Sequence, residues 1–98
     1  MDTKEAAKIF KALSNPNRLE LYLKIAQANE SSFEAKGECF VTDIINSFNI
    51  GAPTISHHIK ELVNANLIST EKKGKFLICK VNKALIEEVS ELLSLKLK

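Results

Sequence analysis

The segment GAPTISHHIKELVNANLI, residues 51–68, decides the fold predicted for this chain. Pro53 suits the first turn of a helix, where its missing N–H group needs no partner. Apolar residues then recur at the spacing that places them on one helical face, which predicts a stripe facing a core. The stripe consists of Ile55, Ile59, Leu62 and Val63. Asn66 stands where a left-handed residue commonly ends a helix, so we predict an amphipathic helix that stops there.

Two further helices are predicted near the N-terminus. Residues 2–13 begin with Asp2 and Glu5 at the spacing of a capping box. Asn15 can cap a second helix that has Pro16 at its first position. The apolar residues predicted to be buried are Ala6, Ile9, Phe10 and Leu13 in the first helix and Leu19, Tyr22, Leu23 and Ala26 in the second.

The middle of the chain predicts a loop and a short helix. Residues 29–37 lose the helical pattern and are predicted to form the longest loop. The stretch ECFVTDIINSF then predicts a short extended piece followed by a helix. Thr42 is a suitable N-cap for a helix over residues 43–48, and Asp43 favours the positive helix N-terminus.

The C-terminal part predicts a hairpin and a last helix. Residues 68–81 read as two strands joined by a turn around Lys73 and Gly74. Asn82 can cap a helix over residues 83–97. A small domain has little core left to cover the wide apolar face of that helix. We therefore predict a subunit interface, with folding back onto its own chain as the alternative.

Positive charge is concentrated in one part of the chain. The 98 residues have a net charge of +2, with 45% hydrophobic and 27% charged residues, which fits one small globular domain. Residues 51–83 contain six basic and two acidic groups, whereas residues 1–50 contain six and seven. A local basic surface suits a polyanion such as nucleic acid. A solvated lysine-rich face is the alternative.

Several classes of function are disfavoured by the sequence. No window approaches the roughly 18 apolar residues that a membrane helix needs, and no signal peptide pattern is present. We therefore expect a cytoplasmic protein without membrane contact. No carboxylate pair, Gly-rich phosphate loop or nucleophile elbow is visible, so we expect neither an enzyme nor a cofactor.

Two helices, a tight turn and a basic hairpin occur in the order of a winged helix-turn-helix. FKALSNPNRLELYLKIA resembles the second-helix signature of ArsR/SmtB-type repressors, TISHHIKELVNANLI resembles their recognition helix, and KKGKFLICKVN resembles their wing. The resemblance covers residues 10–82. It implies a homodimer in which residues 1–13 and 83–98 form the interface.

The predicted architecture is a single α+β domain over residues 1–98. It is mainly α with a small β-hairpin wing, and it contains about five helices and a two- to three-stranded antiparallel sheet. Residues 43–66 are predicted to form the helix-turn-helix, and residues 68–81 the wing.

Polar side chains near the start of the predicted recognition helix suit contact with DNA. Ser and Thr hydroxyls both donate and accept, and a histidine ring can donate to phosphate or to a guanine edge. Thr54, Ser56 and His57 are therefore candidates to face the bases. His58 is expected to contact a phosphate or to brace a neighbouring helix. Adjacent histidines point about 100° apart on a helix, so they are poorly placed to share one metal ion.

Basic side chains add candidate phosphate contacts. Lys72, Lys73 and Lys75 surround the hairpin turn, where exposed ammonium groups suit phosphate or the minor groove. A hairpin that is merely soluble is the alternative. Lys60 on the recognition helix and Arg18 at the start of the second helix are weaker candidates, and Arg18 could instead bridge two helices.

The known metal-binding residues of metal-sensing relatives are absent. Those relatives carry ELCVCDL, whereas this chain has ECFVTDI, with Phe40 and Thr42 at the two ligand positions. The last helix lacks the Asp and His of their second site, so we expect no metal. Cys39 and Cys79 remain as redox candidates, because the segment before the third helix pairs with the second wing strand in such domains. Two small buried hydrophobes are the alternative.

These observations predict a sequence-specific DNA-binding regulator. We expect a homodimeric repressor that binds a pseudo-palindromic site in double-stranded DNA and lacks the recognised metal-sensing sites. The alternative is a winged-helix protein-protein interaction module without an operator, because a fold alone does not decide a function.

Overall fold

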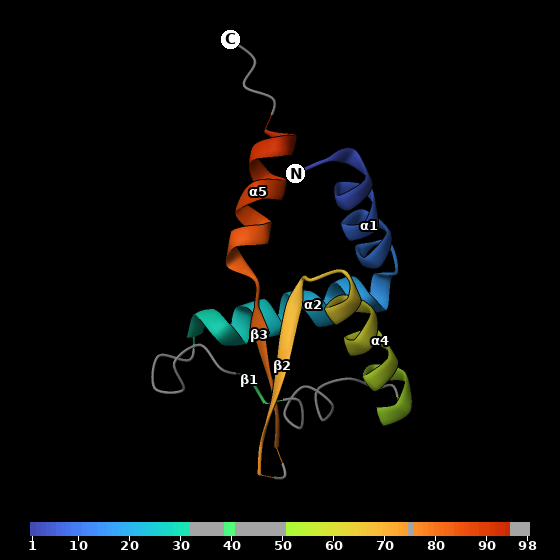
Figure 1. The fold of residues 1–98 in the computed structure, drawn as a ribbon. Coiled ribbons are helices and arrows are strands. Elements are labelled where there is room, and N and C mark those ends of the chain that lie inside the picture. Colours follow the sequence, from blue (N-terminus) through green and yellow to red (C-terminus); the bar gives the residue numbers. More distant parts are fainter. Residues whose placement is uncertain (32–38, 41–50, 75, 95–98) are drawn as a thin grey trace.

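The computed structural model describes residues 1–31, 39–40, 51–74 and 76–94 (Figure 1). Its elements are α1 (Thr3–Leu13), α2 (Pro16–Ser31), β1 (Cys39–Phe40), α4 (Ala52–Asn64), β2 (Ile68–Lys73), β3 (Phe76–Val81) and α5 (Lys83–Leu93). The mainly helical fold with an antiparallel wing is confirmed. The helix predicted over residues 43–48 lies outside the described residues, as does Lys75.

Three helices begin at the side-chain caps that the sequence predicted. The Asp2 carboxylate accepts a hydrogen bond from the Glu5 N–H at 2.7 Å. Asn15 Oδ1 accepts from the N–H of Arg18 at 3.1 Å. Asn82 Oδ1 accepts from the Leu85 N–H at 3.2 Å. Each cap satisfies an N–H group that has no partner inside its own helix.

Helix α2 is longer than predicted. It runs to Ser31, so the first three residues of the predicted loop over 29–37 are helical. Each residue added to an existing helix forms one more backbone hydrogen bond. The helix can therefore extend over a few polar residues beyond its apolar pattern. The rest of that predicted loop, residues 32–37, lies outside the described residues.

Helix α4 ends at the predicted asparagine. Asn66 has a φ of 63°, in the left-handed region. Its N–H donates to the Val63 carbonyl at 2.9 Å, and the Leu67 N–H donates to the Leu62 carbonyl at 3.0 Å. This pair of bonds is a Schellman motif, which closes the helix and turns the chain into β2.

The sheet has the strand order β1-β3-β2, and both pairings are antiparallel. The hairpin aligns Lys73 with Phe76, and Gly74 in its turn has a φ of 61°. Strand β1 pairs with β3 such that Cys39 lies opposite Cys79. The predicted pairing of the segment around Cys39 with the second wing strand is therefore confirmed.

The core lies between α2, α4 and the sheet, with α1 and α5 packed against it. Its fully buried large side chains are Ile9, Leu21, Ile25, Ile55, Leu62, Leu67, Ile78 and Cys79. The apolar stripe predicted for α4 is confirmed, since Ile55, Ile59 and Leu62 are buried and Val63 is half-buried.

The apolar faces predicted for α1 and α2 are partly wrong. In α1, Phe10 is exposed, and Ala12 is buried instead. In α2, Leu19 and Leu23 are exposed, whereas Leu21 and Ile25 are buried together with the predicted Tyr22. Apolar residues occupy several faces of α2, so periodicity could not choose which face the neighbouring elements would cover.

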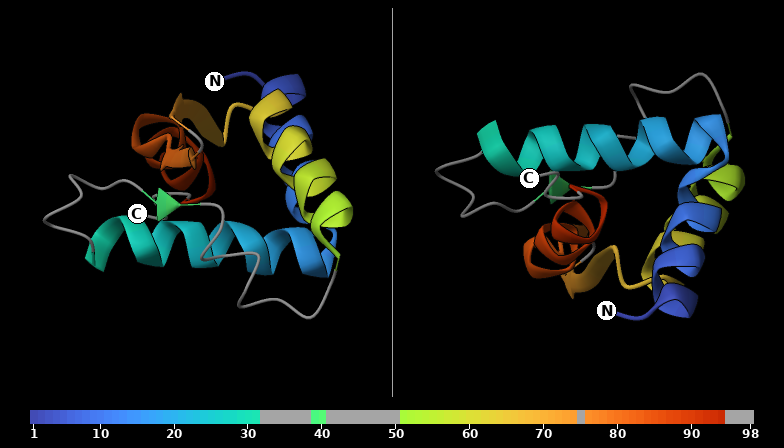
Figure 2. Two further views of the ribbon diagram at one scale, coloured as in Figure 1. Left: turned by 90° about the horizontal axis from the view of Figure 1, so that it is seen from below. Right: turned by 90° about the horizontal axis from the view of Figure 1, so that it is seen from above.

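The two ends of the molecule are built from different elements. In Figure 1 the hairpin turn and the N-terminal end of α4 lie at the lower end, and α1 and α5 lie at the upper end. Helix α2 crosses between them (Figure 1), and the views from below and above show that it runs along one side of the molecule (Figure 2). No described helix is both long and apolar enough to span a membrane.

Candidate nucleic-acid interface

The outer face of α4 carries a set of exposed polar side chains. With about 100° of rotation per residue, Ser56, His57 and Lys60 fall within one arc of about 100°. All three are exposed. The buried Ile55, Ile59 and Leu62 fall on the opposite side. Packing of the apolar stripe therefore determines which polar groups face outward.

The first turn of α4 leaves few backbone donors free, because Pro53 has no N–H group. Gly51 is the N-cap residue and makes no side-chain capping bond. Its carbonyl accepts from the N–H groups of Thr54 at 3.1 Å and Ile55 at 3.2 Å. Thr54 is exposed in this turn. The positive end of the helix dipole favours an anion such as phosphate near this turn, although the N–H groups of Thr54 and Ile55 are already bonded.

The hairpin turn lies at the same end of the molecule as the start of α4 (Figure 1). Lys72 is exposed on β2. Lys73 ends that strand, and only its backbone is described, while Lys75 lies outside the described residues. The left-handed Gly74 lets the chain reverse direction there.

His58 differs from the other residues predicted to contact DNA. Its side chain is only 7% exposed, so the expectation of a direct phosphate contact is corrected in favour of packing. His58 follows Ile55 by three positions and precedes Leu62 by four, which places it on the buried face of α4. That spacing is a sequence signal that could have revealed its burial. Its ring lies 6.1 Å from the ring of His57, centroid to centroid.

The environment of His58 disfavours its charged form. Burial lowers the pKa of its imidazole below the usual range, and the charges of Arg18 and His57 lower the pKa further. Nδ1 of His58 is buried without a hydrogen-bond partner among the described residues. A proton placed on this ring would therefore be poorly accommodated in the folded protein.

We expect folding stability to fall when the pH drops below about 6.5, the usual pKa of an unfolded-state histidine. The folded-state pKa of His58 is lower, so the unfolded chain takes up the proton first, and this contribution is fully present only above that pH. Urea midpoints at pH 7.5, 6.5 and 5.5 should decline less for His58→Gln than for the wild type. The variant His57→Gln removes only the smallest of the three causes, so its midpoint should decline nearly as much as that of the wild type. Equal pH slopes in the wild type and His58→Gln would contradict the assignment.

Arg18 acts as a bridge between helices, one of the two roles considered for it. It begins in α2, and its Nε donates to the Ala12 carbonyl near the C-terminal end of α1 at 2.6 Å. Its side chain is half-buried. This contact satisfies a carbonyl that the end of α1 leaves without an intrahelical partner.

No group of three or more His, Cys, Asp or Glu side chains that could hold a metal ion occurs among the described residues. Cys79 is completely buried within the core. Cys39 lies opposite it in the sheet.

An uncapped helix N-terminus with a polar outer face, standing beside a two-stranded wing, defines a winged helix-turn-helix protein of the nucleic-acid-binding class. Residues 34–70 match the sequence model of the family "Bacterial regulatory protein, arsR family". An arsenical resistance operon repressor from Staphylococcus xylosus is 31% identical over 91 residues, which cover 93% of this chain and 79% of that protein. The chain belongs to the arsR family of bacterial regulatory proteins.

Solved structures share the same fold. An ArsR-like transcriptional regulator from Rhodococcus sp. RHA1 superimposes with a TM-score of 0.75 at 19% identity, covering 93% of this chain and 77% of that one. A homodimeric winged helix-turn-helix DNA-binding domain from Mycobacterium bovis has a TM-score of 0.67 at 21% identity, covering 97% of this chain and 83% of that one.

Proposed function

We propose that this protein is a homodimeric transcriptional repressor that binds a pseudo-palindromic site in double-stranded DNA. The observation that carries the proposal is the exposed arc of Ser56, His57 and Lys60 on a helix whose N-terminus lies at the same end of the molecule as the wing. The repressor relatives of the arsR family support it. Such a regulator would work in the cytoplasm, where the DNA is.

The dimer would be formed by α1 and α5. Apolar side chains remain exposed on both helices, with Leu92 at 40% and Leu93 at 57% on α5 and Phe10 at 40% on α1. These helices lie at the end of the molecule opposite the wing (Figure 1). A two-fold axis there would direct both copies of α4 toward the same side, so that they enter major grooves about one helical turn apart. The Mycobacterium bovis neighbour is homodimeric, which supports a dimer.

Each candidate residue would have a separate task at the interface. Ser56 and His57 would donate and accept at base edges, and Lys60 and Lys72 would contact phosphates. Thr54, exposed in the first turn of α4, would be the third residue to face the bases. His58 would brace α4 and would not touch DNA. Lys73 and Lys75 would extend the positive wing.

The deciding experiment is selection from a randomised pool of DNA duplexes at near-physiological salt. The full-length protein should retain duplexes that share a two-fold symmetric motif with half-sites about 10 base pairs apart. Retention of a random pool, or of no duplex, would favour the alternative of a protein-protein interaction module. No catalytic step enters this proposal.

Replacing Lys72 by Ala should weaken binding to all duplexes by a similar factor. One phosphate contact fewer should reduce the slope of log affinity against log salt by about one. Affinity measured between 50 and 200 mM salt, on the selected site and on random DNA, checks this result. Lys83→Ala, an exposed lysine at the start of α5, is the matched control and should leave the slope unchanged.

We also propose that oxidation joins Cys39 to Cys79 and thereby regulates DNA binding. Direct partners in an antiparallel pair have α-carbons about 4.5 to 5.5 Å apart, within the roughly 4.4 to 6.8 Å that disulfides span. Cys39 and Cys79 are such direct partners in the antiparallel pairing of β1 with β3. Hydrogen peroxide would accept two protons and two electrons from the thiols, so that one S–S bond and two water molecules form. The bond would tie β1 to the wing.

Peroxide treatment should therefore remove both thiols from reaction with a thiol reagent added to the unfolded protein in denaturant, because Cys79 is buried in the folded state, and dithiothreitol should restore them. A proteolytic digest should contain one peptide pair linked through residues 39 and 79. The oxidised protein should differ from the reduced protein in affinity for the selected DNA, whereas Cys39→Ser should show no such difference. If Cys39→Ser responds like the wild type, the proposed disulfide is not the cause.

A further inference from the structure

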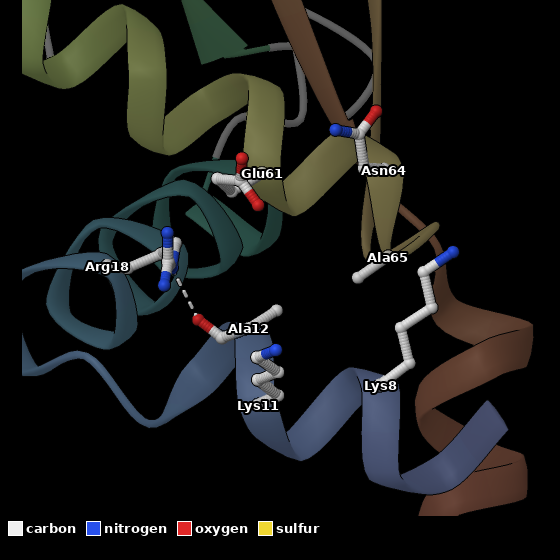
Figure 3. A pocket seen from close by; sticks show the side chains of 7 residues that line it. All are labelled: Lys8, Lys11, Ala12, Arg18, Glu61, Asn64 and Ala65. Carbon is white, nitrogen blue, oxygen red and sulfur yellow. Dashed lines mark hydrogen bonds between the residues drawn. The ribbon is translucent and has the colours of Figure 1, made fainter. Parts of the chain in front are cut away.

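A small pocket lies between α1, the start of α2 and the C-terminal end of α4 (Figure 3). Its volume is about 230 Å³, which is below the roughly 300 to 1,000 Å³ typical of sites for drug-sized ligands. It is lined by Lys8, Lys11, Ala12, Arg18, Glu61, Asn64 and Ala65. None of these residues belongs to the DNA-facing surface proposed above. The pocket is therefore a candidate for a second binding site.

The pocket has an excess of positive charge. Lys8, Lys11 and Arg18 contribute three cations, and Glu61 contributes one carboxylate. Among the described residues, Lys80 and Glu71 form an ion pair at 3.9 Å, and neither residue lines the pocket. The lysines that border the pocket therefore have no carboxylate partner within the described part of the chain. Cations gathered around a small cavity repel one another until an anion enters.

Arg18 is held in position at the edge of the pocket. Its Nε donates to the Ala12 carbonyl at 2.6 Å, the bond drawn as a dashed line in Figure 3. A guanidinium group has five N–H donors in a rigid fork. One donor is used by this bond, and within the described residues the two terminal amino groups remain to bind an oxyanion. In Figure 3 the ammonium group of Lys8 lies beside Ala65, across the pocket from Arg18, so this flexible side chain would have to swing toward a ligand held by Arg18.

Glu61 determines which anion fits. A carboxylate repels an anion that has no proton, but it accepts a hydrogen bond from an anion that carries one. Hydrogenphosphate, with two negative charges and one O–H group, matches the three cations and the single carboxylate. Sulfate has the same charge and similar size but no proton to donate to Glu61. We propose that this pocket binds inorganic hydrogenphosphate in preference to sulfate.

The position of the pocket gives such binding a consequence. Its walls come from α1, placed above at the dimer interface, and from the C-terminal end of α4, the helix that would read DNA. An anion bound there touches both helices, so it stabilises the relative placement of α1 and α4 that it fits best. The regulatory consequence, though not the binding itself, rests on the proposed function. DNA affinity should then change roughly fivefold or more with phosphate, a typical allosteric coupling.

The test begins without DNA. Isotope-labelled full-length protein is titrated at pH 7.5 with sodium phosphate, and separately with sodium sulfate, while sodium chloride keeps the ionic strength constant. The amide signals of Ala12 and Ala65, which line the pocket, should shift and saturate with phosphate and respond much less to sulfate. The double variant Lys8→Gln/Lys11→Gln should lose the saturation. Lys4→Gln, a matched exposed lysine on α1 outside the pocket, should retain it.

The variant Glu61→Gln tests whether Glu61 selects between the two anions, because a purely structural role of Glu61 would not change the preference for phosphate over sulfate. Its neutral amide can donate to either anion, so the preference for phosphate over sulfate should shrink while sulfate binds more tightly. Shifts that remain linear, that are equal for the two anions in the wild type, or that persist in the double lysine variant would overturn the proposal. Amide spectra of the variants verify that each one is folded.

The DNA experiment is kept separate. Saturable phosphate binding together with an unchanged affinity for the selected duplex would overturn the regulatory consequence and leave the binding site established. Phosphate binding by a protein that selects no DNA motif would refute the proposed function and not the pocket. The two failures are therefore distinguishable.

Discussion

Replacing Leu62 by Ala should lower the free energy of unfolding by about 2 to 5 kcal/mol, the range measured for such truncations in well-packed cores. Leu62 is 0% exposed and belongs to the core cluster that joins α4 to α2 and the sheet. Removing its side chain would leave a cavity whose walls come from separate elements and can close only in part. Urea unfolding, monitored by helical circular dichroism at one fixed protein concentration, measures the effect.

Two further variants sharpen this prediction. Leu62→Met nearly conserves volume and should cost less than about 1.5 kcal/mol, so it keeps the experiment informative if the alanine variant does not fold. Leu23→Ala removes the same atoms from an exposed leucine on α2 and should change stability by about 0.5 kcal/mol or less. A loss for Leu23→Ala as large as that for Leu62→Ala would contradict the core described here.

Replacing His57 by Ala should weaken binding to the selected duplex by about 1 to 3 kcal/mol, or roughly 5- to 150-fold. His57 is exposed on the outer arc of α4, where its ring nitrogens can reach a base edge. Because random DNA offers no matched base, affinity for a scrambled duplex should fall much less. Fluorescence anisotropy with both duplexes at one salt concentration compares the two losses.

Asn64→Ala is the control for this experiment. Asn64 is exposed on the same side of α4 as His57 but near the opposite end of the helix, next to the phosphate pocket. In phosphate-free buffer its replacement should leave both affinities unchanged. If His57→Ala weakens binding to the selected and scrambled duplexes equally, the histidine contacts phosphate and does not read bases.

Several elements followed from local signals alone. The cap residues Asp2, Asn15 and Asn82 begin their helices as predicted, because each side chain bonds a backbone N–H only two or three residues away. Asn66 ends α4 and Gly74 turns the hairpin for a similar reason, since both adopt positive φ. Interactions over such short sequence distances do not depend on the rest of the fold.

The burial of particular helix faces was harder to predict. Leu21 and Ile25, and not Leu19 and Leu23, face the core from α2. Either set has helical spacing, so the choice depends on where α4 and β3 contact that helix. His58 was expected to contact a phosphate or to brace a neighbouring helix, and its burial favours the second role. A rotation of about 100° between His57 and His58 makes the first exposed and the second buried.

By itself, the sequence determined where the helices begin, the hairpin turn, the basic middle region and the polar face of α4, because each depends on residues close together in the chain. The ends of α2 and α5, at Ser31 and Leu93, differ from the predicted ones. The family resemblance implied that the segment around Cys39 pairs with the second wing strand, but only the tertiary structure decided the register that places Cys39 opposite Cys79. Only the tertiary structure decided that Lys8, Arg18 and Glu61 border one pocket. These residues belong to elements widely separated in sequence. Their proximity arises from the packing of apolar faces elsewhere in the molecule, and no local pattern records it.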